Sequence, residues 1–228
     1  MDIRDLPGPA HQWLAKVNAR HPWSHNEHFH RWILDNLPTR RRTAMDIGCG
    51  PGVLAGKLAP HFTHVTGIDR DEGMAAAASA RLRDVPRVSI QRCDFADLSP
   101  AADDGGADLI TMVAALHHLD LEDALTHVPS LLTPGGRLLV VGLARPDSPA
   151  DLAFDMVSSA ANPVMGMIKH PRPARPPQPA QGTQPAMPML DPVTTLADIT
   201  RAARVHLPGS IVRRRLFFRY TLRWDKPR

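Results

Sequence analysis

Short apolar runs alternate with helical patterns through the middle of the chain, about residues 43–145. The apolar positions of the helical stretches recur every three or four residues, whereas the strand-like runs are continuous or alternating. Strands that alternate with helices indicate βαβ units and a mostly parallel sheet, so we predict an α/β fold. The predicted strands are 43–47, 64–68, 88–92, 107–113 and 137–143, and the predicted helices are 53–58, 72–82 and 121–132.

The N-terminal region, residues 1–42, contains one clear helical pattern. Ser24 and Glu27 have the spacing of a capping box, which predicts a helix that begins after Ser24 and continues to about Asn36. Phe29, Trp32 and Ile33 share one face of that helix. We therefore expect a helical N-terminal segment ahead of the α/β region.

The C-terminal region combines two helical patterns with two strand patterns. Helices are predicted at 148–160 and 193–206, and strands at 211–218 and 220–224. The two strands are too close in sequence for a crossover, so they should pair antiparallel. A Pro-rich insertion is expected at about 163–192, and its residues 171–192 hold eight prolines, which exclude a regular helix or a central strand. This insertion is either a surface linker or a lid over a site.

The composition is that of a soluble globular protein. The chain has 228 residues, of which 43% are hydrophobic and 22% charged. Its longest apolar run, 138–144, is far shorter than the roughly 20 residues of a membrane helix. The N-terminus has no apolar signal core, and two cysteines cannot form a disulfide scaffold. We expect a cytoplasmic protein without a membrane partner, either a monomer or a homodimer.

The charged residues leave one further class of partner open. The net charge is +4, and arginines cluster at 40–42 and 213–215. Such clusters are usually solvated faces, and the arginine enrichment can reflect a GC-rich genome. They make a nucleic-acid partner possible without requiring one.

A glycine-rich turn between the first strand and its helix is the strongest chemical signal. Gly48, Gly50 and Gly52 follow Asp46, and a helix begins at Val53. Glycines let the main chain turn sharply and approach a ligand, and ligands of open α/β sheets bind beyond the carboxyl ends of the strands. A dinucleotide fingerprint would need Gly or Ala where Val53 stands, which disfavours an NAD-binding oxidoreductase.

The turn and the motifs that follow it resemble the class I S-adenosylmethionine-dependent methyltransferases. The second strand ends on Asp69, the third leads to Asp94 and Phe95, and a Pro-Gly-Gly turn at 134–136 precedes the fifth. The resemblance is close over 43–145 and holds in outline over 193–225. It implies a Rossmann-like fold with a mostly parallel seven-stranded sheet whose last strand is antiparallel, S-adenosylmethionine as cofactor and S-adenosylhomocysteine as product.

The resemblance also implies a cofactor site, residue by residue. The glycines would wrap the methionine part of the cofactor, Asp46 would orient the loop and contact the amino group, and Cys49 would contribute main chain. Asp69 would accept the ribose hydroxyls, and Asp94 and Phe95 would hold the adenine. The implied cofactor-binding residues are Asp46, Gly48, Cys49, Gly50, Gly52, Asp69, Arg70, Met74, Asp94, Phe95, Val113 and Ala114.

Two histidines follow the fourth strand, where the acceptor of the methyl group should lie. In the phosphoethanolamine methyltransferases a histidine at the position of His118 pairs with a tyrosine of an N-terminal lid. No tyrosine precedes Tyr220 here, so a lid histidine, which could be His25, His28 or His30, would have to replace it. His118 first and His117 second are candidate general bases, although a structural histidine at a helix start is the alternative for His118.

The acceptor itself is predicted to be a small molecule. The fourth strand lacks the Asn/Asp-Pro-Pro-aromatic motif of enzymes that methylate amino groups in DNA. The branch that includes natural-product and quinone methyltransferases matches best, and the run 23–30 resembles bacterial natural-product enzymes, some of which methylate an indole carbon. We therefore expect an aromatic or indolic acceptor, with C-, O- or N-methylation. Trp23, His25 and Trp32 would bind it from an N-terminal lid formed by residues 1–42, and residues 43–228 would form the cofactor-binding domain.

Several alternatives remain open at this point. The arginine clusters would suit an RNA or protein methyltransferase, and the turn could belong to an NAD-binding oxidoreductase or to a cofactor-binding module without activity. A metal site is not expected, because His25 and His28 share a helix face while His30 points elsewhere, and no further ligands with zinc spacing follow.

Overall fold

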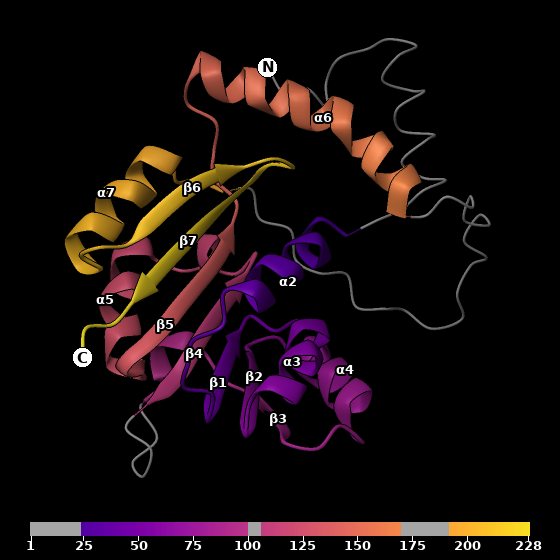
Figure 1. The fold of residues 1–228 in the computed structure, drawn as a ribbon, viewed down its shortest axis with the longest axis vertical. Coiled ribbons are helices and arrows are strands. Elements are labelled where there is room, and N and C mark those ends of the chain that lie inside the picture. The colour runs from indigo at the N-terminus through magenta and orange to yellow at the C-terminus, as the bar shows by residue number, and fades with distance from the viewer. Residues whose placement is uncertain (1–23, 100–105, 170–191) are drawn as a thin grey trace.

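The computed structural model describes residues 24–99, 106–169 and 192–228, which form a seven-stranded sheet covered by helices (Figure 1). The strand order is β3-β2-β1-β4-β5-β7-β6. Strands β1 to β5 are mutually parallel, β7 is antiparallel to β5, and β6 is antiparallel to β7. The strands are β1 (Thr43–Ile47), β2 (His64–Asp69), β3 (Val88–Arg92), β4 (Ala107–Val113), β5 (Leu132–Gly142), β6 (Ile211–Arg215) and β7 (Arg219–Asp225).

This topology confirms the predicted Rossmann-like class with its reversed strand at the end of the chain. The helices are α2 (His25–Asp35), α3 (Val53–Leu58), α4 (Glu72–Leu82), α5 (Leu121–Leu131), α6 (Pro149–Lys169) and α7 (Leu196–His206). Short 3-10 helices are η2 (Ala59–His61), η3 (Phe95–Asp97) and η4 (Leu116–His118).

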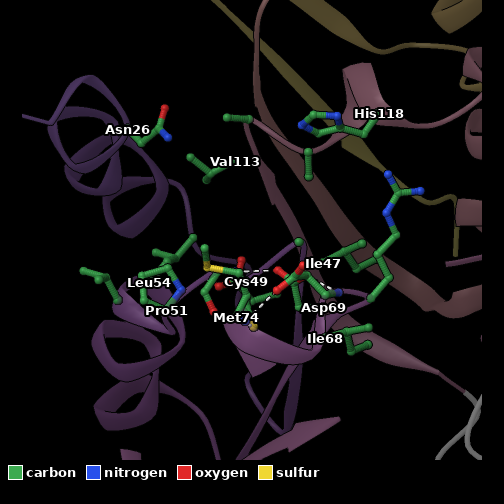
Figure 2. Close-up of a pocket in the computed structure, with 18 of the residues that line it drawn as sticks. Asn26, Ile47, Cys49, Pro51, Leu54, Ile68, Asp69, Met74, Val113 and His118 are labelled. Atoms are coloured by element: carbon green, nitrogen blue, oxygen red, sulfur yellow. Dashed lines mark hydrogen bonds between the residues drawn. The ribbon is translucent and has the colours of Figure 1, made fainter. Parts of the chain in front are cut away.

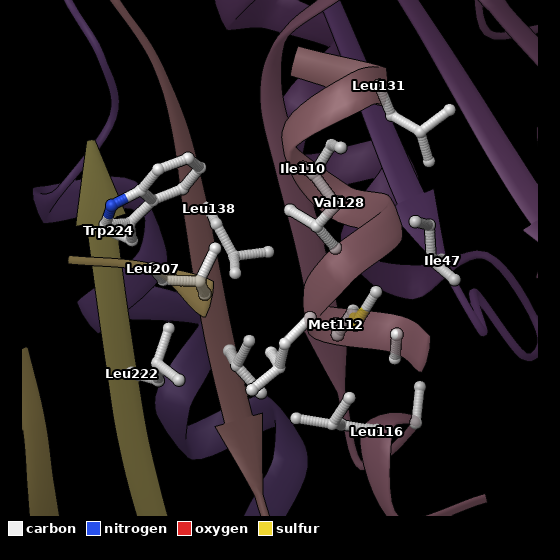
Figure 3. Packing of buried hydrophobic residues seen from close by; sticks show 14 of the residues in the cluster. Ile47, Ile110, Met112, Leu116, Val128, Leu131, Leu138, Leu207, Leu222 and Trp224 are labelled. Atoms are coloured by element: carbon white, nitrogen blue, oxygen red, sulfur yellow. The ribbon is translucent and has the colours of Figure 1, made fainter. Parts of the chain in front are cut away.

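The core forms two apolar clusters, and neighbouring residues of the central strands alternate between them. Leu138 and Val140 of β5 belong to the cluster beneath α5 and α7, whereas Leu139 and Val141 belong to the cluster beneath α2 and α3. Figure 3 shows the first cluster, where Trp224 and Leu222 of β7 lie near Leu207. Because both faces are covered, the central strands are apolar almost throughout, as parallel strands usually are.

Helix α2 forms where the capping pattern predicts it and is anchored to the sheet. The Ser24 hydroxyl accepts a hydrogen bond from the Glu27 amide at 3.2 Å. Phe29 and Ile33 are buried in the same cluster as the central strands, and Trp32 packs against that cluster. The described part of residues 1–42 is therefore packed on the domain through its apolar face. Its division from 43–228 as a lid stays a prediction, and Trp23 lies outside the described residues.

Four predicted boundaries in the second half of the chain are wrong by three residues or more, and one of them is the start of α7, which is Leu196 and not residue 193. Helix α6 continues to Lys169 instead of ending at Ala160, so residues 163–169 belong to this helix and not to the expected insertion. The proline within the helix removes one main-chain donor but does not prevent the residues after it from being helical. Residues 170–191 of that insertion lie outside the described residues. Strand β5 begins at Leu132, not Arg137, because its Pro-Gly-Gly segment lies within the strand as an irregularity in the β4–β5 register.

The fourth boundary is the end of β6, which stops at Arg215 and not at residue 218. Phe217 and Phe218 have φ of 63° and 60°, so they form the turn into β7. Positive φ at a bulky side chain is rare, and no pattern of apolar residues announces it. The antiparallel pairing of the two strands is confirmed.

Candidate active site

A cavity of about 250 Å³ opens at the carboxyl ends of β1, β2 and β4, between α2 and the segment that follows β4 (Figure 2). Most of the predicted cofactor residues line it. The predicted residues on its wall are Asp46, Gly48, Cys49, Gly50, Asp69, Arg70, Met74, Asp94, Phe95, Val113, Ala114 and His118. The cavity therefore brings together predicted residues that lie up to 72 positions apart in sequence, from Asp46 to His118.

The glycine turn forms one wall of the cavity in a conformation that requires glycine. Gly48, Gly50 and Gly52 have φ of 68°, 51° and 75°. A Cβ on Gly48 would lie 2.5 Å from the Cβ of Ala115. The amides of Gly48 and Cys49 both donate to the carbonyl of Ile68, which holds the turn against β2. Gly52 does not line the cavity; it is the N-cap of α3.

Asp69, the last residue of β2, links that strand to the glycine turn. Its Oδ2 accepts from the Gly50 amide at 2.8 Å and its Oδ1 accepts from the Asp71 amide at 2.9 Å. Each carboxylate oxygen has two acceptor lone pairs, so both oxygens can still accept a ligand hydroxyl. The position at the edge of the cavity fits the predicted contact with a ribose.

Asp46 lies beneath the turn and is buried. Its Oδ1 accepts from the Thr111 hydroxyl at 2.8 Å, whereas its Oδ2 is buried with no hydrogen-bond partner among the described residues. Burial is the main reason that the pKa of Asp46 rises to about 7. Burial also raises the pKa of the neighbouring Cys49 thiol, so Cys49 is not a reactive thiolate.

Asp94 and Phe95, which follow the third strand, also line the cavity. Asp94 is the N-cap of η3, and its Oδ1 accepts from the Ala96 amide at 3.1 Å. Phe95 is buried, and its ring meets the ring of His127 edge to face at 5.2 Å. A carboxylate beside an apolar ring suits a heterocycle that carries an amino group, as predicted for adenine.

The segment after β4 carries the two candidate bases. Ala114 has φ of 53°, a strained conformation for a residue with a Cβ, and its amide donates to the carbonyl of Val141 at 2.7 Å. His117 and His118 follow in η4, with ring centroids 4.0 Å apart and both Nδ1 atoms buried without a hydrogen-bond partner among the described residues. Only His118 lines the cavity.

Both imidazoles are held in the neutral form at neutral pH. Burial, and then the nearby Arg70, lowers the pKa of His118. Burial, and then His118 and Arg219, lowers the pKa of His117 to about 4. His118 is therefore a neutral imidazole on the cavity wall, and a neutral imidazole can accept a proton.

Helix α2 contributes a different face from the one expected. Asn26, Glu27 and His30 line the cavity together with Ser24, whereas His25, His28 and Trp32 do not. His25 and His28 contact the ring of Phe217 instead, at centroid distances of 6.0 and 5.4 Å. The reason is the helical phase, because burial of Phe29 and Ile33 turns the face that carries 26, 27 and 30 toward the cavity.

Asn26 and Glu27 are lining residues that the sequence analysis did not predict, whereas His30 is the one of the three candidate lid histidines that lines the cavity. His30 is buried, and its Nδ1 lies 3.1 Å from the Nζ of Lys57, which in turn lies 3.8 Å from a Glu27 oxygen. The helical spacing of Asn26, Glu27 and His30 could have revealed this face. The sequence analysis instead assigned Trp23, His25 and Trp32 to acceptor binding.

The glycine cradle, the unpartnered Asp46 oxygen and the carboxylates that end β2 and β3 fit S-adenosylmethionine. Addition of a Cβ would fill the turn, and Asp46 lacks a donor that an amino group could supply. A family model described as a methyltransferase domain matches residues 45–138. An uncharacterised methyltransferase of Mycobacterium tuberculosis is 31% identical over 211 residues, which are 90% of this chain and 98% of that protein.

The chain belongs to the class I S-adenosylmethionine-dependent methyltransferases.

Two further comparisons extend this result. The methyltransferase is similar to a trans-aconitate 2-methyltransferase of Methylobacterium radiotolerans, with 30% identity over 72% of this chain and 62% of that protein. A solved S-adenosylmethionine-dependent methyltransferase from Aquifex aeolicus has the same fold, with a TM-score of 0.58, 15% identity, and coverage of 93% of this chain and 97% of that one.

Metal-binding clusters and membrane-spanning helices are both absent from the described residues of the methyltransferase. Over 24–99, 106–169 and 192–228, no group of three or more His, Cys, Asp and Glu side chains is arranged to hold a metal ion. Within the same ranges, no helix has both the length and the apolar character needed to cross a membrane.

Proposed function

We propose that this methyltransferase acts on a small-molecule acceptor and that His118 is the general base. The observation that carries the proposal is the location of His118 on the cavity wall, across from α2, with a buried Nδ1 that lacks a partner among the described residues. The cofactor supplies an activated methyl group on a sulfonium. The protein therefore has to orient an acceptor, exclude water and accept a proton.

The residues divide this work between the two ends of the cavity. The glycine turn, Asp69, Asp94 and Phe95 would hold the cofactor at one end. At the other end, Asn26 of α2 lies on the same side of the cavity as His118, away from Asp69, and His30 of α2 also lines the cavity. A neutral His118 could remove a proton from a phenol or an amine, or from an aromatic carbon after its attack.

A small-molecule acceptor is favoured over RNA by the contacts of the arginine clusters. Arg40 donates to Asp108 through its Nε at 2.5 Å, and Arg41 donates to the carbonyl of Pro38 at 2.9 Å. Arg214 pairs with Asp151, and Arg215 donates to the hydroxyl of Thr221. These arginines hold the fold together, which gives both clusters a structural explanation. The relative named for trans-aconitate supports the same choice.

The aromatic or indolic nature of the acceptor remains a prediction. Trp32 and His25 do not line the cavity, and Trp23 is outside the described residues. Among the lining residues Phe95 has the one hydrocarbon ring, and we assign it to the adenine. The proposal therefore rests on His118 and the cavity that it lines, with phenols and indoles as the first acceptors to test.

The experiment is an acceptor screen that measures S-adenosylhomocysteine release, followed by kinetics of His118→Ala. We expect kcat to fall about 10²- to 10⁴-fold, with unchanged affinity for S-adenosylhomocysteine in calorimetry. His64→Ala is the matched control, because His64 is the first residue of β2 and the cavity lies at the other end of that strand. Methyl transfer to RNA or a peptide but to no small molecule would overturn the acceptor class, and full activity of His118→Ala would overturn the base.

A further inference from the structure

Asn26, in the first turn of α2, is held by an arginine from the other end of the chain. Arg219, the first residue of β7, donates from its Nη2 to the Oδ1 of Asn26 at 2.9 Å. The same guanidinium donates from its Nη1 to the carbonyl of Phe218 at 3.3 Å. A guanidinium has donors and no acceptor, so the atom of Asn26 that it contacts has to be the oxygen. Arg219 therefore fixes which way round the amide of Asn26 lies.

The nitrogen of the same amide is left for the cavity. Asn26 lines the cavity, and its Nδ2 forms no hydrogen bond with the described residues. Unlike the Oδ2 of Asp46 and the Nδ1 of His118, it is not a buried atom without a partner, so it keeps accessible surface. Figure 2 shows this nitrogen turned toward Val113. The amide therefore presents its N–H donors to a ligand in the cavity.

Asn36, the C-cap residue of α2, shows how the same helix uses an asparagine for structure alone. Its Oδ1 accepts from the Nη1 of Arg223, also on β7, at 3.3 Å, and its Nδ2 donates to the carbonyl of Trp32 at 2.8 Å. Both ends of that amide are satisfied inside the protein. Asn26 makes the same kind of contact with β7, but its nitrogen has no partner within the described ranges. The comparison indicates that this nitrogen serves a ligand.

An aspartate at position 26 would suit the contact better than asparagine if that contact only fixed α2 to β7. The guanidinium of Arg219 is largely buried and pairs with no carboxylate in the described part of the chain, and an unpaired buried charge is costly. A negative charge in the first turn of a helix is also favoured by the helix dipole. The neutral amide gives up both advantages, and in return it places donors on the cavity wall.

These donors lie at the end of the cavity that we assign to the acceptor. The glycine turn, Asp69 and Asp94 are assigned to the cofactor. Asn26 lies with His118, on the side of the cavity away from Asp69 (Figure 2). An acceptor within reach of a base at His118 therefore has its other polar atoms near Asn26.

We propose that Asn26 binds an oxygen atom of the acceptor and that Arg219 is the positioning residue that orients its amide. This inference rests on the proposed small-molecule function. An N–H donor needs a lone pair, which a carbonyl or hydroxyl oxygen supplies and a hydrocarbon group does not. Among aromatic acceptors, the site therefore selects phenols and indoles that carry an oxygen in addition to the atom that is methylated. Unsubstituted indole and phenol lack this second group.

The test is calorimetry on the protein saturated with S-adenosylhomocysteine, with two pairs of probes of matched shape. 4-Hydroxyacetophenone is compared with 4-ethylphenol, and indole-3-carbaldehyde with 3-methylindole. Within each pair, a carbonyl group replaces a methylene or methyl group. The ratio of the two dissociation constants, hydrocarbon compound over carbonyl compound, measures recognition of the oxygen, because the contacts that both compounds make cancel.

In Asn26→Ala this ratio should fall about 3- to 10-fold for at least one pair, the effect of one hydrogen bond. In Asn26→Asp it should fall further, because a carboxylate oxygen would face the carbonyl while the contact with Arg219 is kept. Arg219→Met should lower the ratio less than Asn26→Ala, since the amide remains but is free to turn. Asn36→Asp is the matched control, with the same substitution at the same kind of arginine contact outside the cavity, and it should leave the ratio unchanged.

Three outcomes would overturn the inference. One is a ratio that is the same in wild type, Asn26→Ala and Asn26→Asp, whether the probes keep their affinities or lose them equally, because the contact would then only fix α2. The second is a loss of S-adenosylhomocysteine affinity in Asn26→Ala, which would assign the amide to the cofactor. The third is failure of both carbonyl compounds to bind the wild type. If Asn26→Asp does not fold, Asn26→Ala decides, because it removes the donor without adding a charge.

The same variants separate this inference from the proposed function. Methyl transfer that depends on His118, with the same preference between paired acceptors in wild type and Asn26→Ala, would overturn the oxygen contact alone. The absence of methyl transfer to any small molecule, with transfer to RNA or peptide, would overturn the proposed function itself.

Discussion

The carboxylate of Asp69 accepts a hydrogen bond from the main-chain amide of Gly50 at 2.8 Å. This contact joins the end of β2 to the middle of the glycine turn. The other carboxylate oxygen of Asp69 accepts a hydrogen bond from the amide of Asp71, the N-cap residue of α4. The group that is expected to hold the ribose is thus oriented before the cofactor binds, and it also orients the loop that is expected to hold the methionine part.

Asp69→Ala should therefore weaken binding of S-adenosylhomocysteine about 10- to 100-fold or more, because a charged acceptor is lost and the turn loses a restraint. Calorimetric titration measures the change. Glu72→Gln is the matched control, since Glu72 is an exposed carboxylate three residues on that pairs with Arg92 at the surface. Unchanged affinity in Asp69→Ala would refute the ribose assignment.

Gly48→Ala tests whether the turn needs glycine for its conformation and for space. Gly48 and Gly209 both have positive φ, 68° and 85°, but a Cβ on Gly48 would meet Ala115 at 2.5 Å while one on Gly209 would meet nothing within 4 Å. Gly209→Ala should cost about 1–2 kcal/mol for the conformation alone. Gly48→Ala should cost about 1–3 kcal/mol more for the overlap and also weaken cofactor binding.

Urea denaturation of the two variants provides the comparison. The difference between them isolates the steric contribution, because both substitutions place Ala in the left-handed region. Equal losses would mean that Ala115 moves aside at little cost, and that space is not what selects glycine at position 48.

The fold and the cofactor end could be predicted because the sequence marks them locally. Strand ends, acids and glycines occur in chain order, and the parallel topology then brings Asp46, Asp69 and Asp94 to one edge. The acceptor end depends on helical phase and on strand pairing far along the chain. The buried face of α2 decides that His30 and not His28 lines the cavity. Arg219 donates a hydrogen bond to Asn26, which lies 193 residues earlier in the sequence. No local pattern contains that information.

Element boundaries failed for two different reasons. The helix predicted from 193 begins at Leu196 because Thr195 and Asp198 form a complete capping box, so the sequence itself marks this boundary. In contrast, the turn at Phe217 and Phe218 carries no such signal. There, the Phe217 amide donates to the hydroxyl of Ser158 in α6, so a distant contact stabilises the turn.

The stability of the protein should depend on pH through Asp46. Its pKa is about 7 in the folded protein against 3.8 as the ordinary value, so the folded state binds more protons between these values. Stability is therefore fully present below pH 4 and is lost as the pH rises to 7, by about 1.4 kcal/mol for each pH unit. Asp46→Asn cannot ionise, so its stability relative to wild type should increase across this window and level off above pH 7.

Urea denaturation at several pH values measures this difference. Asp97→Asn serves as the control, because Asp97 is exposed on η3 and its substitution should give no such trend. A stability difference between Asp46→Asn and wild type that does not change from pH 4 to 7 would show that Asp46 is charged in the folded protein throughout, with a donor for its Oδ2.

The last prediction concerns Asp108, near the start of β4 and therefore at the end of this strand that lies away from the cavity. Asp108 is buried and accepts from the Nε of Arg40 at 2.5 Å, the amide of Arg42 at 2.7 Å and the hydroxyl of Thr133 at 3.1 Å. Asp108→Ala leaves these donors without a partner and should destabilise the protein by about 2–3 kcal/mol. Arg40 is about half exposed, so Arg40→Ala should cost less, about 1 kcal/mol.

Arg31→Ala is the matched arginine control, because Arg31 is exposed and pairs with Asp35 only at 3.6 Å within α2, so its loss should be close to zero. Urea denaturation ranks the three variants, and calorimetry should show unchanged affinity for S-adenosylhomocysteine in each folded variant, since the contact lies far from the cavity. If Asp108→Ala is as stable as wild type, the arginine cluster at 40–42 is not held by this carboxylate, and its charge is available to an acidic partner such as RNA.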